Sequence, residues 1–144
     1  MPGVDAVGEF SAWLSTNGVG TIGDDLSANA MPESTKVTVG VFEIPTGMPH
    51  LLHSTSYIRK PRFRIDVRST APAAGDYPDI TNARNRAGLA YQACLDIAGS
   101  TLASTGSTGH WILAIPESEP YLSSRDEKNR SVFSFTVGCE RQSG

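Results

Sequence analysis

The strongest constraint on the fold is a strict alternation of apolar and charged residues at positions 62–68. Phe63, Ile65 and Val67 alternate there with three arginines and an aspartate. A period of two residues indicates a β-strand, because successive side chains of a strand point to opposite faces of the sheet. The strand therefore has one apolar face for a core and one charged face.

Three further segments have the patterns of strands. Residues 36–44 are rich in β-branched residues, which favour strands, and they end before Pro45. Residues 110–115 are apolar on both faces, as expected of a central strand, and Pro116 stops them. Residues 133–139 alternate again between apolar and polar side chains. The sequence therefore predicts four strands.

Two helices are expected at residues 4–14 and 79–98, where apolar residues recur at spacings of three and four. Gly18 and Gly99 follow them, as is usual past the end of a helix. The order α-β-β-α-β-β favours the α+β class, with two helices packed on one face of a four-stranded, largely antiparallel sheet. Irregular connections are expected at residues 18–33, 100–109 and 120–130.

The connection at residues 45–61 is unusually long for a compact domain. It contains Leu51, Leu52 and Tyr57, three large side chains in a segment without a strand or helix pattern. Long connections of this kind are usually functional. We expect an arm or the long end of a hairpin.

Length and composition favour one domain over residues 1–144, because the hydrophobic residues do not divide into two groups. A chain of this size can form a core without a metal or a disulfide. Cys94 and Cys139 are the only cysteines, and we expect them to be reduced and buried. No apolar stretch reaches the ~18 residues of a membrane span, and the N-terminus has no leader pattern. We therefore expect no membrane contact and synthesis in the cytosol.

No pattern in the sequence predicts catalysis, a cofactor or a metal. Residues 18–23 match the glycine spacing of dinucleotide-binding loops, but a helix precedes them where such a loop needs a strand. His50 and His53 are spaced like a pair of metal ligands, yet no carboxylate lies between them. No serine occupies a nucleophile elbow, and Cys94 falls on a buried helix face. We expect a protein that is not an enzyme.

The strongest charge feature is residues 59–68, with five cations and one acid in ten residues. Arg62, Arg64 and Arg68 share one face of the strand. They either protect a solvent-facing edge from aggregation or form a contact face for an acidic subunit surface or for nucleic-acid phosphates. The net charge of −3 is not that of a dedicated nucleic-acid binder. The residues alone leave these alternatives open.

Several segments together resemble one protein family. A helix with Phe10-Ser-Ala-Trp-Leu14 and a Gly18-Val-Gly20 turn is followed by Met31-Pro32-Glu33, a valine-rich strand and Pro45-Thr46-Gly47. Next come Arg64-Ile-Asp-Val-Arg68-Ser69, a helix led by Asp79-Ile80, and the turn Arg125-Asp126-Glu127-Lys128-Asn129-Arg130 into Phe133-Ser-Phe135. This order resembles the minor capsid and tail terminator proteins of tailed bacteriophages with long, non-contractile tails.

The resemblance implies an α+β subunit of a homo-oligomeric ring, a hexamer, that caps the head-proximal end of the tail tube and joins the tail to the head. Its partners would be copies of itself, the tail tube protein and the connector or stopper protein of the head, with non-specific contact to DNA in the lumen. The ring would assemble in the host cytoplasm and become part of the virion. The alternatives are another neck component, such as a head-completion or stopper protein, and a monomeric nucleic-acid-binding or ligand-binding module that uses the arginine-rich strand.

A closed ring needs an interface in which two different surfaces of neighbouring subunits meet. We expect these surfaces on residues 45–61, on residues 120–130 and on the arginine-rich strand. The predicted interface residues are Leu51, Leu52, Tyr57, Arg59, Arg62, Arg64, Arg68, Arg125, Asp126 and Arg130.

Overall fold

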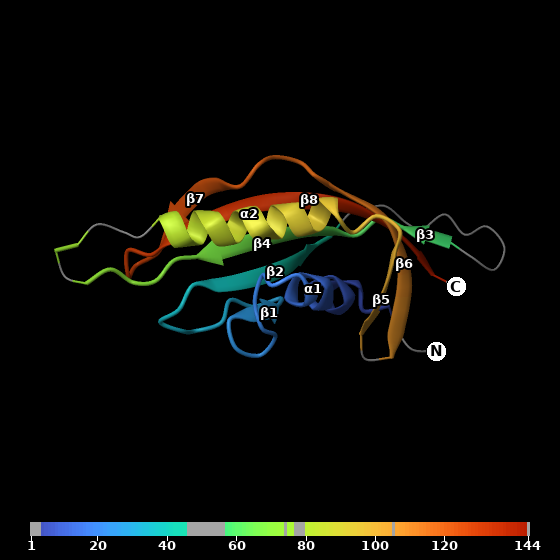
Figure 1. Cartoon of the computed structure of the whole chain (residues 1–144), viewed down its shortest axis with the longest axis horizontal. Helices are drawn as coiled ribbons and strands as arrows, with labels where there is room; N and C mark the ends of the chain where they lie inside the picture. Colours follow the sequence, from blue (N-terminus) through green and yellow to red (C-terminus); the bar gives the residue numbers. More distant parts are fainter. Residues whose placement is uncertain (1–3, 46–56, 74, 77–79, 105, 144) are drawn as a thin grey trace.

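The computed structural model describes residues 4–45, 57–73, 75–76, 80–104 and 106–143 (Figure 1). They form the helices α1 (Ala6–Thr16) and α2 (Thr81–Leu95). The strands are β1 (Leu26–Ala28), β2 (Thr38–Ile44), β3 (Tyr57–Arg59), β4 (Arg62–Arg68), β5 (Ser100–Ser104), β6 (Ser107–Pro116), β7 (Tyr121–Arg125) and β8 (Ser131–Ser143).

The long strand β8 is the spine of the sheet. Along one edge it pairs with β4 and then with β3, and along the other edge it pairs with β7 and then with β6. Beyond these neighbours, β2 and β1 extend one side and β5 extends the other, which gives the order β1-β2-β4-β8-β6-β5. The β1–β2 pair is parallel, and the other pairs are antiparallel.

Both helices cover the same face of this sheet (Figure 1). The Phe10 ring of α1 stacks on Phe63 of β4 with 4.7 Å between the centroids, and Tyr91 of α2 meets Phe135 of β8 edge-on at 5.9 Å. Phe63 and Phe135 lie on one face because Ile65, two residues after Phe63, pairs directly with Phe135. The expected placement of the two helices is therefore observed.

The prediction of a four-stranded, largely antiparallel sheet is wrong, although the α+β class holds. The described residues form one curled, mixed sheet of eight strands. Three of the extra strands, β1, β5 and β7, fall in segments expected to be irregular, and the fourth is β3. They lack an apolar alternation because they are short or lie at sheet edges, and backbone pairing with a longer neighbour stabilises them instead.

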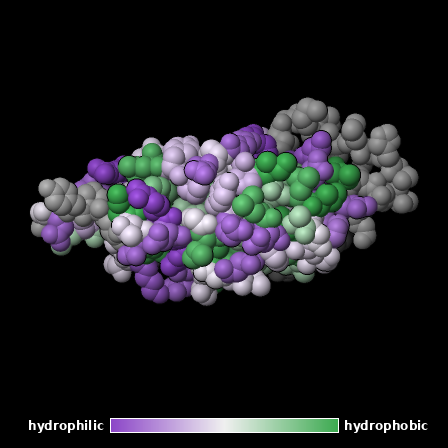
Figure 2. Space-filling model, turned by 45° about the horizontal axis from the view of Figure 1, so that its top comes forward, coloured by the Kyte–Doolittle hydropathy of each residue, from purple (hydrophilic) through white to green (hydrophobic). Residues whose placement is uncertain are grey.

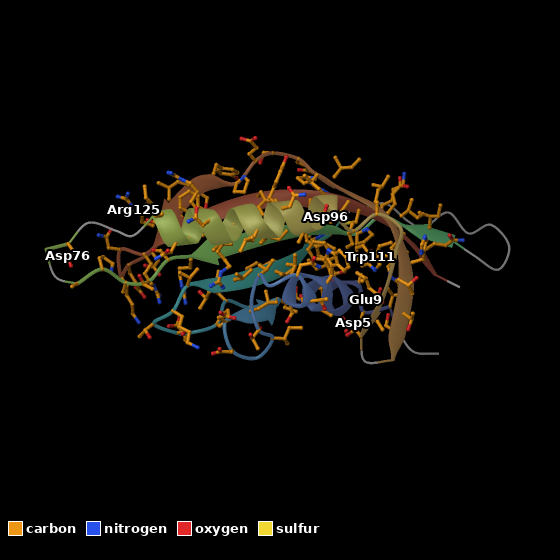
Figure 3. The ribbon with its side chains drawn as sticks, in the orientation of Figure 1. Asp5, Glu9, Asp76, Asp96, Trp111 and Arg125 are labelled. Carbon is orange, nitrogen blue, oxygen red and sulfur yellow. The ribbon has the colours of Figure 1, made fainter. Side chains whose placement is uncertain are left out.

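A buried ion pair fixes α1 to the sheet. The Glu9 carboxylate is fully buried and accepts hydrogen bonds from Nε and Nη2 of Arg141, both at 2.8 Å, and from Nε1 of Trp111 at 2.9 Å. The Ser107 hydroxyl also donates to it. Gly109 makes room for this arrangement, because a Cβ at that position would overlap with the Arg141 guanidinium. Figure 3 shows Glu9 on α1 and Trp111 on β6 side by side.

The other local predictions concern helix ends and cysteines. α1 begins after Asp5, whose carboxylate accepts a hydrogen bond from the backbone N–H of Gly8, and Gly18 follows the helix end with a φ of +80°. Cys94 and Cys139 are free and buried, which confirms the prediction. Neither of the described helices is long and apolar enough to cross a membrane.

Candidate functional site

The face of the sheet opposite the helices, here called the open face, carries the predicted arginines. Arg62, Arg64 and Arg68 lie on it together with Asp66, because Phe63 and Ile65 between them point to the core. Neither described helix packs against this face. The open face is therefore a surface at which another molecule can meet the sheet.

Carboxylates of the same chain already pair with the arginines of the open face. Arg62 donates to both carboxylate oxygens of Glu117, with the shortest distance at 2.8 Å. Arg64 donates to Asp66 at 3.1 Å and also lies over the Phe42 ring, 4.8 Å from its centroid. Positive and negative charges consequently alternate on the open face, which lowers its attraction for a uniformly charged polyanion such as DNA.

A second surface is the outer edge of the sheet along residues 112–125, here called the β6–β7 edge, which pairs with no other strand among the described residues. All five residues of β7 are exposed, and β6 has no β5 partner beyond Trp111. Ile115, Tyr121 and Leu122 are 61%, 55% and 46% exposed. Figure 2 shows apolar patches separated by polar atoms on the face that carries α2 and β7. A free edge with exposed apolar side chains favours association with another chain.

The third surface, here called the basic end, consists of Arg68, Lys128 and Arg130 around Glu33. These residues come from the end of β4, the turn between β7 and β8, and the loop before β2. The Glu33 carboxylate lies 3.5 Å from Arg68, 3.9 Å from Arg130 and 4.0 Å from Lys128. Both guanidinium side chains are more than nine-tenths buried, whereas the Glu33 side chain is 73% exposed.

Asp126 organises the turn that presents Lys128 and Arg130. Its carboxylate accepts hydrogen bonds from the backbone N–H groups of both residues, at 3.0 and 2.9 Å, and from Nε of Arg130 at 2.6 Å. Burial alone would raise the pKa of Asp126, but the hydrogen bonds from Arg130 outweigh it, and the pKa lies below its usual value. Asp126 is therefore engaged within its own turn, which leaves Glu33 as the acceptor shared by the three cations.

The cations of the basic end are incompletely satisfied. Each distance to Glu33 exceeds the ~2.7–2.9 Å of a charge-assisted hydrogen bond. Nη2 of Arg68 donates to the Pro32 carbonyl at 2.7 Å, but its buried Nε has no hydrogen-bond partner among the described residues. An open cavity of about 300 Å³ lies beside this group, lined by Glu33, Ser34, Thr35, Ala71, Lys128 and Arg130.

The structure does not bring the predicted interface residues together in one place. Arg62, Arg64 and Arg68 share the open face, and Asp126 and Arg130 join Arg68 at the basic end. Arg125 is the exposed last residue of β7, and Figure 3 places it near the same end of the molecule as Asp76. Arg59 belongs to β3, as does the backbone of Tyr57. Leu51 and Leu52, like His50 and His53, lie outside the described residues.

Sequence reasoning missed Glu33, Lys128 and Glu117 as contact residues. Glu33 and Lys128 stand inside segments that carried the family resemblance, and the fold brings those segments together at Arg68 and Arg130. Glu117 follows the end of β6 and had no pattern of its own. The described residues contain no group of three His, Cys, Asp or Glu side chains arranged to hold a metal ion.

The chain is similar to known proteins both in sequence and in fold. The model of a family described as bacteriophage tail terminator protein matches residues 13–142. A solved chain from the virion of a native gene transfer agent (GTA) particle has a TM-score of 0.59 at 15% sequence identity, and the match covers 96% of this chain and 99% of that chain. At such an identity the likeness shows a shared fold. No curated protein matches the sequence.

Proposed function

The chain belongs to the bacteriophage tail terminator family, and from this we propose that it is the ring subunit that caps the head-proximal end of the tail tube. Membership makes it a structural protein of the virion tail or neck. The match to the family model over nearly the whole chain carries the proposal. The proposed ring is a homohexamer whose two faces meet the tube protein and the head connector or stopper.

We propose that the β6–β7 edge forms one contact between neighbouring subunits of the ring. The β7 part of this edge lies within residues 120–130, one of the segments expected to make such contacts. Its unpaired backbone and its exposed Ile115, Tyr121 and Leu122 support this role. A closed ring requires a different surface on the neighbour, because identical patches facing each other would give a two-fold dimer.

The test is sedimentation and negative-stain imaging of the purified chain, alone and with tail tube protein. We expect a ring with a central hole that binds the end of the tube. Tyr121→Ser should release monomers, whereas Leu89→Ser should leave the ring intact, since Leu89 is similarly exposed but lies on α2. A chain that stays monomeric at high concentration and with tube protein would contradict the proposal. A ring that binds the portal complex and not the tube would favour the stopper alternative.

The alternative of a nucleic-acid-binding module has one structural argument against it, the alternating charge of the open face. Because Glu117 and Asp66 pair with Arg62 and Arg64, we expect weak binding to duplex DNA with a shallow salt dependence. Fluorescence anisotropy at several salt concentrations measures this. A loss of about a thousandfold or more in affinity between 50 and 200 mM salt, typical of about six to ten phosphate contacts, would favour the module instead.

A further inference from the structure

We propose that the basic end binds an acidic side chain of another virion protein, and that Glu33 occupies this carboxylate site when the partner is absent. The inference rests on the proposed function for the nature of the partner, which is another protein of the assembled tail or neck. The binding itself depends on the geometry of Arg68, Lys128 and Arg130 and can be measured on the purified chain.

The first argument is the burial of Arg68 with too few acceptors. Burying a guanidinium is costly unless carboxylates or carbonyls replace its hydration. Arg130 has Asp126 at 2.6 Å, but Arg68 has one carbonyl bond, a 3.5 Å contact to Glu33 and a buried Nε without a hydrogen-bond partner among the described residues. Among the described residues, Glu33 is the only carboxylate that pairs with Arg68.

The second argument is that Glu33 is poorly held. Its side chain is 73% exposed, and it contacts three cations at 3.5 to 4.0 Å without a short hydrogen bond to any of them. Exposed ion pairs of this kind contribute little to stability. Glu33 can therefore turn into solvent at small cost, and the carboxylate of a partner can take its place.

The third argument concerns the chemistry of the occupant. The cavity beside Glu33 is about 300 Å³ and open, and it presents Lys128, Arg130, Ser34 and Thr35, all of which carry hydrogen-bond donors. With Glu33 turned into solvent, three cations face one carboxylate, Asp126. A single acidic side chain then restores the charge balance that Glu33 provides, whereas a polyanionic DNA backbone would also meet Asp126.

The experiment measures the binding of fluorescein-labelled hexaglutamate by fluorescence anisotropy. Glu33→Gln removes the internal competitor, so we expect the peptide to bind about two- to fivefold more tightly than to the wild type. Lys128→Gln should weaken binding by a similar factor. Both side chains are largely exposed, so these variants are expected to fold. Glu127→Gln is the matched control for Glu33→Gln. It also removes one negative charge, from an exposed position next to Lys128 in the turn between β7 and β8.

A carbodiimide reaction locates the bound peptide in the Glu33→Gln variant. It joins a carboxylate to a neighbouring amine, and the chain has three lysines, Lys36, Lys60 and Lys128. We expect the peptide on Lys128. Equal tightening by Glu33→Gln and Glu127→Gln, coupling confined to Lys36 or Lys60, or no binding at millimolar peptide would overturn the inference. Preference for a DNA duplex over the peptide at the same site would also overturn it, in favour of phosphate.

The ring assay separates this inference from the proposed function. If the wild type forms a ring on the tube but the peptide fails these tests, only the inference is refuted. If no ring forms while the peptide couples to Lys128, the proposed function is refuted and the carboxylate site remains. The Leu89→Ser variant, which changes neither surface, should behave as the wild type in both assays.

Discussion

Replacing Glu9 with glutamine should cost the protein a large part of its stability. Glu9 and Arg141 are 0% and 1% exposed, so the pair is shielded from solvent. In the Glu9→Gln variant, the buried Arg141 would lose the Glu9 carboxylate, and the new amide N–H₂ would face a guanidinium or the Ser107 hydroxyl. Removing one partner of a buried pair typically costs about 3–5 kcal/mol, because the remaining charge is left uncompensated. Whole domains are stable by about 5–15 kcal/mol.

Urea unfolding followed by tryptophan fluorescence measures this loss. With a denaturant slope of about 2 kcal/mol per molar, a loss of about 4 kcal/mol moves the midpoint down by about 2 M. The control is Glu117→Gln, which breaks the Arg62 pair on the open face, where the side chains are 39% and 48% exposed. That change should cost no more than about 1 kcal/mol.

Equal midpoints for Glu9→Gln and Glu117→Gln would refute the reasoning, because burial would then make no difference to the two ion pairs. A double variant tests the cause directly. Glu9→Leu combined with Arg141→Met removes both charges, so it should recover much of the stability that Glu9→Leu alone loses. If the double variant is less stable than the single one, the uncompensated charge is not the source of the loss.

Four further outcomes follow from the structure. Gly109→Ala should destabilise by an amount similar to Glu9→Gln and should add little to it in the double variant, because both changes disrupt the Glu9–Arg141 ion pair. Urea titration of the double-mutant cycle checks this. Burial raises the pKa of Cys94 to about 12 and that of Cys139 above its usual value, so iodoacetamide should alkylate both only after unfolding. Since the unfolded thiols ionise first, near their ordinary pKa of 9.0, the unfolding free energy should fall as the pH rises above 9. Asp126→Asn should destabilise the protein at pH 7 but less at acid pH. A carboxylate with a lowered pKa contributes stability above its unfolded pKa of 3.8, and this contribution is lost as the pH falls through the folded pKa. Thermal unfolding of the wild type and the variant at several pH values checks this.

The parts of the fold that sequence predicts are those whose pattern is local. The strand at residues 62–68 matches β4 at both ends, because every residue in it follows the alternation. β8 continues beyond the predicted end at residue 139 for a physical reason: Arg141 occupies the next core-facing position, where an apolar residue was expected. Glu9 interrupts the apolar character of α1 in the same way. Glu9 and Arg141 each interrupt an apolar pattern because the two side chains are buried against each other as an ion pair.

In the candidate site, too, the sequence predicts what depends on local spacing and not what depends on tertiary contacts. That Arg62, Arg64 and Arg68 share a face follows from their spacing alone. Their partners do not, because Glu117 is 55 residues from Arg62 and becomes its neighbour only through the pairing of both strands with β8. The importance of Glu33 also depends on tertiary structure, since it reaches cations that lie on separate segments.

The charged groups of this protein differ in how completely the chain itself satisfies them, and that difference indicates where assembly acts. The buried Glu9–Arg141 pair has hydrogen bonds at 2.8 Å on two atoms, so it holds α1 in place whether or not a partner is present. Arg62 and Glu117 on the open face also hydrogen-bond to each other directly, so a partner there gains little from breaking this pair. Two of the cations around Glu33, Arg68 and Arg130, are buried like the first pair, but the carboxylate that they share is exposed and loosely held. An interface gains electrostatic energy when a partner supplies a better-placed opposite charge than the free subunit has. Among the three surfaces, the basic end is the one whose cations can gain such a charge.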